Sequence, residues 1–375
     1  MTSLMPVVED ATQLGFAEEP LARLDALIRR HIAEGRYPGC QIALARHGRF
    51  AFVRAYGKAA IESATPADDR TLWLLYSGTK PLAAALIWSL VEEGVLSFAD
   101  RVADHLPGFD ANGKGEVTIL QLLTHQAGFP NAVISEAAWQ DHALLAREVA
   151  AIELEWEPGS RTVYHVRSAH WVVAALVEAV TGVDFRVALK ERLLAPLGLE
   201  RDIFVGFAGT EKARIAPMYA CRDDGSIGQI ESENSALWLE AGIPSSGGYA
   251  TAQGLAAYYQ MLINGGELGG VRLFSPRLVS YATQNFTGER VDELFKVPMR
   301  RALGPHVRGE APLVRSLGTL AHPRTIGQGG NGCSVAWGDP DSGVSFAYLT
   351  NLRTSEPWHS ARLEYVSNLV HTAIR

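Results

Sequence analysis

Ser77 and Lys80 lie three positions apart in Ser77-Gly-Thr-Lys80, between an apolar stretch and a run with helical spacing that starts at Pro81. Residues three apart on a helix share a face, so the lysine amine can reach the serine hydroxyl. Serine is a weak nucleophile until a base takes its proton, and helix N-terminal amides favour negative charge. The segment therefore predicts a nucleophile, a proton-handling amine and a positive field.

The Ser77-Lys80 spacing is a weak signal by itself, because the chain contains six lysines. At ordinary serine usage, chance places a serine three positions before one of them about one time in three. A helix-capping Ser77 with an exposed Lys80 is the alternative interpretation. A catalytic interpretation therefore needs partners elsewhere in the chain.

Two further residues are candidates for proton transfer. Tyr164 precedes the strongest helical pattern, 167–180, so its phenol could meet Ser77, although plain packing is the alternative. His125 could act as a base, but it stands at a helix end beside a glycine turn. A hydrogen-bonding structural role is favoured for this histidine.

The run Gly327-Gln328-Gly329-Gly330-Asn331-Gly332 fits the spacing GxGxxG. It lacks the βαβ context of a dinucleotide site, so we expect a glycine-rich strand entry where backbone approaches a ligand. His165 and His170 are the only close histidine pair, and the HExxH and GxSxG motifs are absent. The sequence therefore predicts no cofactor and no metal, and gives no sign of an α/β-hydrolase nucleophile.

The composition is that of a globular protein, with 375 residues, 47% apolar residues and a net charge of −7. The acidic balance argues against nucleic acid or an anionic membrane as a partner. The longest apolar run, 81–91, is too short to span a bilayer, and the acidic segment 1–20 does not read as a secretory signal. We expect a cytoplasmic monomer or homodimer that acts on a small molecule. The three cysteines, far apart in sequence, favour buried apolar side chains over disulfides.

The order of the elements indicates the architecture. Helices are predicted over 21–34, 118–123, 139–152, 167–180, 185–194, 251–263 and 359–374, and hairpins over 41–46 with 50–56 and 333–337 with 344–349. Strands near both termini with helices between them predict one antiparallel sheet built from the two ends of the chain, with a helical region inserted.

Taken together, these residues resemble the serine β-lactamase-related hydrolases: class C β-lactamases, DD-peptidases (penicillin-binding proteins) and family VIII carboxylesterases. Ser77-Gly-Thr-Lys80 is similar to the SxxK motif of the family, and Tyr164-His-Val166 to its Tyr-x-Asn segment. Gln328-Gly-Gly330 stands where the family has Lys-Thr-Gly or His-x-Gly. The resemblance runs from about Leu21 to the C-terminal helix, with similar landmarks at 122–130, 196–199 and 247–252.

The resemblance implies an α+β fold of the β-lactamase/transpeptidase type. An antiparallel sheet flanked by helices (α/β/α) is expected to carry an inserted, mostly helical domain. We expect the sheet domain over 1–95 and 240–375, the helical domain over 96–239, and the active site in the cleft between them.

The resemblance also implies a mechanism. Ser77 would form an acyl-enzyme, Lys80 and Tyr164 would share the base role, and the backbone N–H groups of Ser77 and Asn331 would bind the oxyanion. Gln328, Gly329 and Gly330 would contact the substrate.

Two departures from the family pattern favour one substrate class. Val166 replaces the asparagine that helps to bind a substrate amide, and Gln328 replaces the lysine that helps to hold a β-lactam carboxylate. Cleavage of short-chain carboxylic esters needs neither contact, and is the function we expect. The alternatives are β-lactam, amide or D-amino-peptide hydrolysis, acyl transfer, and a non-catalytic binding protein.

Overall fold

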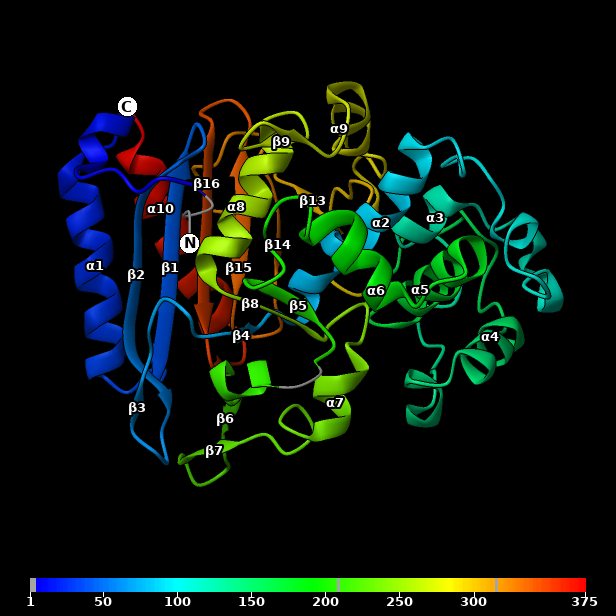
Figure 1. Ribbon diagram of the computed structural model, residues 1–375, viewed down its shortest axis with the longest axis horizontal. Coiled ribbons are helices and arrows are strands. Elements are labelled where there is room, and N and C mark those ends of the chain that lie inside the picture. Colours follow the sequence, from blue (N-terminus) through cyan, green and yellow to red (C-terminus); the bar gives the residue numbers. More distant parts are fainter. Residues whose placement is uncertain (1–4, 208–209, 314–315) are drawn as a thin grey trace.

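The computed structural model describes residues 5–207, 210–313 and 316–375. Its centre is a seven-stranded antiparallel sheet with the strand order β13-β14-β15-β16-β1-β2-β3 (Figure 1). These strands are β1 (Gly39–Arg46), β2 (Arg49–Ala60), β3 (Thr65–Pro66), β13 (His306–Val307), β14 (Ile326–Gly329), β15 (Val335–Asp339) and β16 (Val344–Thr350). N-terminal and C-terminal strands meet where β1 pairs with β16, which confirms the predicted sheet.

Helices cover both faces of this sheet, and alternation along β1 shows why. Successive strand residues point to opposite faces. Ile42 and Leu44 pack in the apolar cluster that holds α1 (Glu18–Ala33) and α10 (Trp358–Ala373). Ala43 and Ala45 pack in the cluster that holds α8 (Ala252–Ile263). The result is a three-layer α/β/α arrangement. Helices α1 and α10 pack together on one face of the sheet, and α8 packs on the other face (Figure 1).

Ten α-helices lie in the described residues: α1 (Glu18–Ala33), α2 (Lys80–Glu92), α3 (Ile119–Leu123), α4 (His142–Ala151), α5 (Ser168–Thr181), α6 (Phe185–Leu189), α7 (Ala236–Ala241), α8 (Ala252–Ile263), α9 (Pro276–Ala282) and α10 (Trp358–Ala373). Local chemistry fixes several helix starts. Thr118 and Gln121 form a capping box at α3, and Thr251 caps α8. The helices α2 to α6 gather toward the right of Figure 1.

Short strands build the surroundings of the site. They are β4 (Trp73–Leu74), β5 (Ile203–Val205), β6 (Tyr219–Cys221), β7 (Ile227–Gln229), β8 (Gly248–Ala250), β9 (Glu267–Leu268), β10 (Val271–Arg272), β11 (Val291–Asp292), β12 (Val297–Pro298) and β17 (Leu352–Arg353). Strand β4 pairs with β8 and leads directly into the turn before α2. Helix α2 in turn packs against α5 and α6. One apolar cluster therefore runs from the sheet through α2 into the helical region.

The structure corrects some sequence-based expectations. The helix predicted from 139 begins at His142, because Asp141 accepts the N–H of Leu144 as its cap. The helix predicted over 185–194 changes to a wider π-turn at Lys190. Cys221 is exposed, unlike Cys40 and Cys333. The predicted domain boundaries at 95/96 and 239/240 stay predictions. In the described part of the chain, no helix is both long and apolar enough to cross a membrane.

Candidate active site

Ser77 is presented by a strained turn. The preceding residue, Tyr76, has a φ of 45°, a backbone conformation that is uncommon for residues other than glycine. The phenol of Tyr76 donates to Oε1 of Glu233 at 3.0 Å, which holds the turn in place. The chain then forms a 3₁₀ turn over Tyr76–Thr79 and enters α2. Ser77 is the one residue between 71 and 80 that is not buried.

Tyr164 and Lys80 both approach the Ser77 hydroxyl. The Tyr164 hydroxyl donates to Ser77 Oγ at 2.8 Å, across 87 positions of sequence. The Lys80 ammonium donates to the same oxygen at 3.3 Å. The three side chains that the sequence singled out therefore form one hydrogen-bonded group.

Lys80 is fully buried. Besides Ser77, its ammonium donates to the backbone carbonyls of Val166 at 2.8 Å and Ser245 at 3.1 Å. Burial lowers the pKa of Lys80, and the neighbouring phenol of Tyr164 opposes that shift. The amine is thus held in a fixed position and biased toward its neutral, proton-accepting form.

Gly330 brings the end of β14 against the serine turn. A Cβ atom at this position would lie 2.3 Å from the carbonyl oxygen of Leu75, so only glycine fits. The sequence predicts that the glycines of this strand let backbone approach a ligand. At Gly330 the chain's own backbone makes the close approach instead, whereas at Gly329 a Cβ would meet only ordinary contacts from 3.5 Å. Asn331 follows Gly330 directly in the chain and lines the same cavity as Ser77.

Gln328 turns its amide along its own strand. Its Nε2 donates to the carbonyl of Gly329 at 3.1 Å, and its buried Oε1 has no hydrogen-bond partner among the described residues. The Gly329 carbonyl can only accept a hydrogen bond, so it is the NH₂ group of the Gln328 amide, and not its oxygen, that faces this carbonyl. Gln328 therefore offers the site no positive charge where a lysine would offer one.

A cavity of about 670 Å³ opens over this group. Of the predicted site residues, Ser77, Tyr164, Gln328, Gly329, Gly330 and Asn331 line it, and Lys80 lies buried next to Ser77. One part of the wall is apolar, with Leu294, Phe295, Val297, Met299, Val307 and Leu317. Another part is polar and charged, with Arg167, Glu233, Arg353, Glu356 and His359. The cavity has room for an uncharged acyl or alcohol group beside the Ser77 hydroxyl.

The family model described as Beta-lactamase matches residues 24–369. The chain belongs to the β-lactamase family. This β-lactamase-family protein is 30% identical over 312 residues to the esterase/beta-lactamase LipL of Mycobacterium tuberculosis (strain ATCC 25618 / H37Rv). That match covers 74% of the chain and 68% of LipL.

Solved structures agree with the family assignment. A family VIII carboxylesterase superposes with a TM-score of 0.81 at 26% identity, over 95% of this chain and 98% of its own. A penicillin-binding protein homologue from Caulobacter crescentus gives a TM-score of 0.81 at 28% identity, over 95% and 99%. The predicted β-lactamase/transpeptidase-like α+β fold is confirmed, and the protein is a serine hydrolase of this family.

Several side chains of this β-lactamase-family site gave no sequence signal. Arg301 and Asp292 form a buried ion pair next to Tyr164, yet they lie in a charged segment that looks like a solvated loop. Leu294-Phe295, an apolar pair amid charges, was the one visible hint that this segment reaches the cavity. Among the aromatic side chains near the site, Trp238 and His359 line the cavity, whereas Phe129, Tyr249 and Trp337 are core residues.

His125 takes the structural role predicted for it. It is buried, and its Nδ1 accepts the backbone N–H of His165 at 3.1 Å. Its ring also packs against the ring of Tyr164, with 4.6 Å between the ring centroids. Burial holds the pKa of His125 well below its usual value, so the imidazole stays neutral beside the tyrosine.

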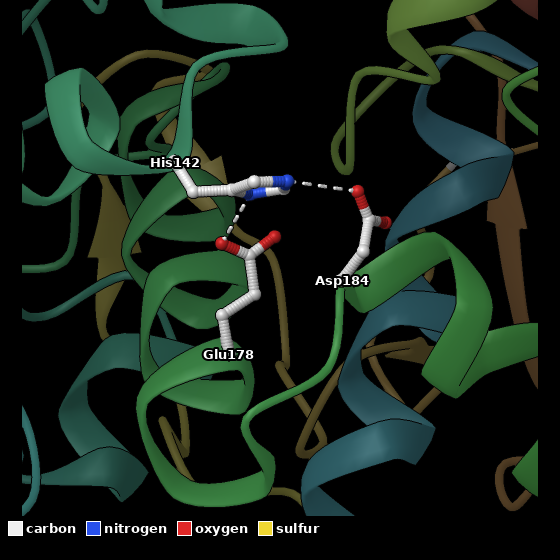
Figure 2. A group of neighbouring side chains, drawn as sticks. All are labelled: His142, Glu178 and Asp184. Carbon is white, nitrogen blue, oxygen red and sulfur yellow. Dashed lines mark hydrogen bonds and ion pairs between the residues drawn. The ribbon is translucent and has the colours of Figure 1, made fainter.

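Two groups in the described chain have the side chains of a metal site, and neither lines the Ser77 cavity. Figure 2 shows His142 between the carboxylates of Glu178 and Asp184, at 2.7 and 3.3 Å from its two ring nitrogens. Asp184 is also paired with Arg186, and in the second group, His322–Asp339–Asp341, Asp341 is paired with Arg324. The adjacent guanidinium groups already neutralise these carboxylates, which disfavours a cation. The predicted absence of metal stays a prediction.

Proposed function

We propose that this protein hydrolyses carboxylic esters of short acyl chains through an acyl-enzyme on Ser77. The observation that carries the proposal is that Ser77 Oγ receives hydrogen bonds from both Tyr164 and Lys80 at the floor of an open cavity. A serine hydroxyl needs such a base to act as a nucleophile. An esterase and a carboxylesterase among the similar proteins support the same chemistry.

Acylation begins when the Lys80–Tyr164 pair, in the state that has given up one proton, accepts the proton of Ser77. The Ser77 oxygen attacks the ester carbonyl, whose π-electron pair moves onto the carbonyl oxygen. The backbone N–H groups of Ser77 and Asn331 stabilise that oxyanion. When the carbonyl re-forms, the C–O bond to the alcohol breaks, and Tyr164 returns the proton to the leaving oxygen.

Deacylation repeats these steps with water. The Lys80–Tyr164 pair takes a proton from a water molecule, and the resulting hydroxide attacks the acyl carbonyl. The bond between that carbon and Ser77 Oγ then breaks, Ser77 recovers its proton, and the carboxylic acid leaves. Unperturbed tyrosine and lysine lose a proton only near pH 10, so the lowered pKa of Lys80 helps the pair to act nearer neutrality.

The substrate-facing groups favour esters over β-lactams. Val166 is 51% exposed and lines the cavity, and its side chain offers no hydrogen bond to a substrate amide. Gln328 supplies no positive charge to hold a substrate carboxylate. The apolar wall at Leu294, Phe295 and Val297 suits an ester without charged groups.

Other chemistry on the same residues is the second candidate. A match to a penicillin-binding protein homologue supports β-lactam, amide or D-amino-peptide hydrolysis, and acyl transfer to an alcohol uses the same acyl-enzyme. The non-catalytic alternative is disfavoured because serine, lysine and tyrosine are all in place and within hydrogen-bond reach.

One panel of substrates tests the proposal. Purified protein is given p-nitrophenyl esters of graded acyl length, a chromogenic cephalosporin and a D-amino-acid amide, beside the Ser77→Ala variant. We expect the highest kcat/KM for short-chain esters and its loss in Ser77→Ala. A higher kcat/KM for the cephalosporin or the amide would move the function to the second candidate. The absence of any turnover, together with no labelling of Ser77 by a fluorophosphonate, would show a non-catalytic protein.

Several wider expectations stay predictions. These are the cytoplasmic location, the monomer or homodimer, the absence of nucleic-acid and membrane partners, and the absence of a cofactor. We also propose that the site lies between a sheet domain (1–95 and 240–375) and a helical domain (96–239).

A further inference from the structure

A second cation besides Lys80 faces Tyr164. The guanidinium carbon of Arg301 lies 4.7 Å from the centroid of the Tyr164 ring. Arg301 is 1% exposed, and its Nη2 pairs at 2.7 Å with the fully buried carboxylate of Asp292. A buried ion pair loses the hydration of both charges and is a weak source of stability. Its place beside the proposed catalytic tyrosine therefore points to a functional role.

Asp292 attaches this pair to the tyrosine main chain. Its Oδ1 accepts the backbone N–H of Tyr164 at 3.3 Å and that of Leu294 at 3.0 Å. On the other side of the guanidinium, Nη1 of Arg301 donates to Nε2 of His306 at 2.5 Å. Because both Nη atoms of Arg301 are bound, the guanidinium stays over the Tyr164 ring. Tyr164 is thus contacted at its backbone by Asp292 and at its ring by Arg301.

The titratable groups around Tyr164 differ in whether they can hold a charge. The Lys80 ammonium lies 4.9 Å from the ring centroid, but burial lowers its pKa. The neighbouring histidines, His125, His165 and His170, are buried, with pKa values held well below the usual range. An arginine, by contrast, keeps its charge at every pH of interest.

The charged groups beyond this shell are engaged elsewhere or already paired. Arg167 lies over the rings of Trp139 and Trp238 at the cavity wall. Asp292 is bound by Arg301, and His306 accepts a hydrogen bond from the same guanidinium. Arg301 is therefore the permanent cation that lies over the Tyr164 ring, whereas the charge of Arg167 acts on the Lys80 amine.

We infer that Arg301 is a positioning residue of the hydrolase: its charge, held over Tyr164 by Asp292, favours the form of the Lys80–Tyr164 pair that has lost one proton and can accept another from Ser77. A cation attracts the face of an aromatic ring, and it attracts a phenolate ring more strongly. The same charge repels the Lys80 ammonium and adds to the effect of burial on the pKa of that amine. This inference rests on the proposed base role of Lys80 and Tyr164.

The test follows the pH dependence of Ser77 reactivity rather than turnover alone. Two quantities are measured from about pH 5 to pH 10: the second-order rate of Ser77 labelling by a fluorophosphonate, and kcat/KM for a short-chain ester. This range covers pH values below and up to roughly the usual pKa values of lysine and tyrosine. In Arg301→Gln we expect the acid limb of both profiles to move up by about one pH unit, since a charge at this distance shifts a pKa by about 1–3 units. At pH values below the limb, the rate should fall about tenfold. Arg301→Lys, which restores the charge, should recover part of that loss.

Two further variants separate this effect from damage to the fold. Arg301→Gln/Asp292→Asn removes both charges together and leaves no unpaired buried ion, so it decides the question if the single variant does not fold. Arg300→Gln is the matched control, because Arg300 is buried next in sequence but pairs with Glu289. We expect the double variant to show the raised limb and the control to keep the wild-type limb.

The outcomes distinguish this inference from the proposed function. A uniform loss of rate at all pH values with an unmoved limb in Arg301→Gln or the double variant would show a purely structural role and overturn the inference. A raised limb in Arg300→Gln would also overturn it. A wild-type protein that neither labels nor turns over would refute the proposed function itself, and the inference with it.

Discussion

The Lys80 ammonium donates a 2.8 Å hydrogen bond to the backbone carbonyl of Val166, two residues beyond Tyr164. The contact uses the main chain, so it does not depend on which side chain stands at this position. The lysine is thereby tied to the loop that carries the tyrosine, while the Val166 side chain points at the cavity. In the proposed mechanism, the backbone of Val166 therefore helps to position the base, while its side chain faces the substrate.

Val166→Asn tests substrate recognition. The variant should fold as the wild type does, because the side chain is half exposed, and should keep ester turnover within a few-fold. A new amide can donate to and accept from a substrate amide, and one such hydrogen bond, worth about 1.4 kcal/mol, raises kcat/KM for a β-lactam by about tenfold. Val133→Asn, at a valine that is 84% exposed, is the control. Unchanged cephalosporin kinetics in Val166→Asn would contradict the expected role.

Tyr164→Phe removes only the hydroxyl that bonds to Ser77. The ring contacts with His125 and Arg301 remain available, so we expect an unchanged melting temperature. Loss of a proton-transfer group should lower kcat by about 10²–10⁴-fold. The exposed Tyr281 provides a control as Tyr281→Phe. A near-wild-type rate in Tyr164→Phe would remove the tyrosine from the mechanism.

Lys80→Met should separate activity from stability. Because burial lowers the pKa of Lys80 below its usual 10.5, the unfolded chain binds more protons than the folded protein between the lowered pKa and 10.5. The free energy of unfolding therefore rises with pH in that window, by up to about 1.4 kcal/mol per pH unit. The variant should lose turnover and show a flatter rise in urea titrations at several pH values. Lys58→Met, at an exposed lysine of β2, should keep the wild-type slope.

The buried histidines should make the fold sensitive to acid. Burial holds the pKa of His170 well below its usual 6.5 and lowers that of His165 to about 3. Below pH 6.5 the unfolded chain takes up protons that these folded imidazoles do not, so stability falls as the pH drops, by up to about 1.4 kcal/mol per pH unit for each histidine. His170→Leu should reduce this slope in denaturant titrations between about pH 4 and 6.5. An equal slope in His170→Leu would contradict the expected neutral state.

Chelation should leave the activity unchanged. The proposed chemistry uses only Ser77, Lys80, Tyr164 and backbone amides, and the His142 group lies outside the cavity lining. Ester turnover is compared before and after dialysis against EDTA. A loss that is restored by added Zn²⁺ would show a metal requirement and would direct attention to His142, Glu178 and Asp184.

Much of this protein is determined by local sequence. Helical spacing places α1, α5, α8 and α10, and Thr251 at the start of α8 and Gly182 after α5 add local signals, because periodicity and capping act over one or two turns. Ser77 and Lys80 are three positions apart on one turn, so their contact is also local. The predicted helix start at 139 was wrong because two local signals compete there. The Asp141 cap sets the start of the helix at His142, although apolar residues before it continue the helical spacing.

The tertiary structure alone decided the rest of the site. Tyr164 reaches Ser77 across 87 positions, and no periodicity encodes that distance; the resemblance to a family suggested it. Only glycine fits at position 330, because its backbone packs against the carbonyl oxygen of Leu75. Arg301 lies over Tyr164, where it forms a buried ion pair with Asp292. A charged residue is written the same way in a sequence whether it faces water or a buried partner. Burial and pairing, which set its energy and its effect on neighbouring protons, exist only once the chain is folded.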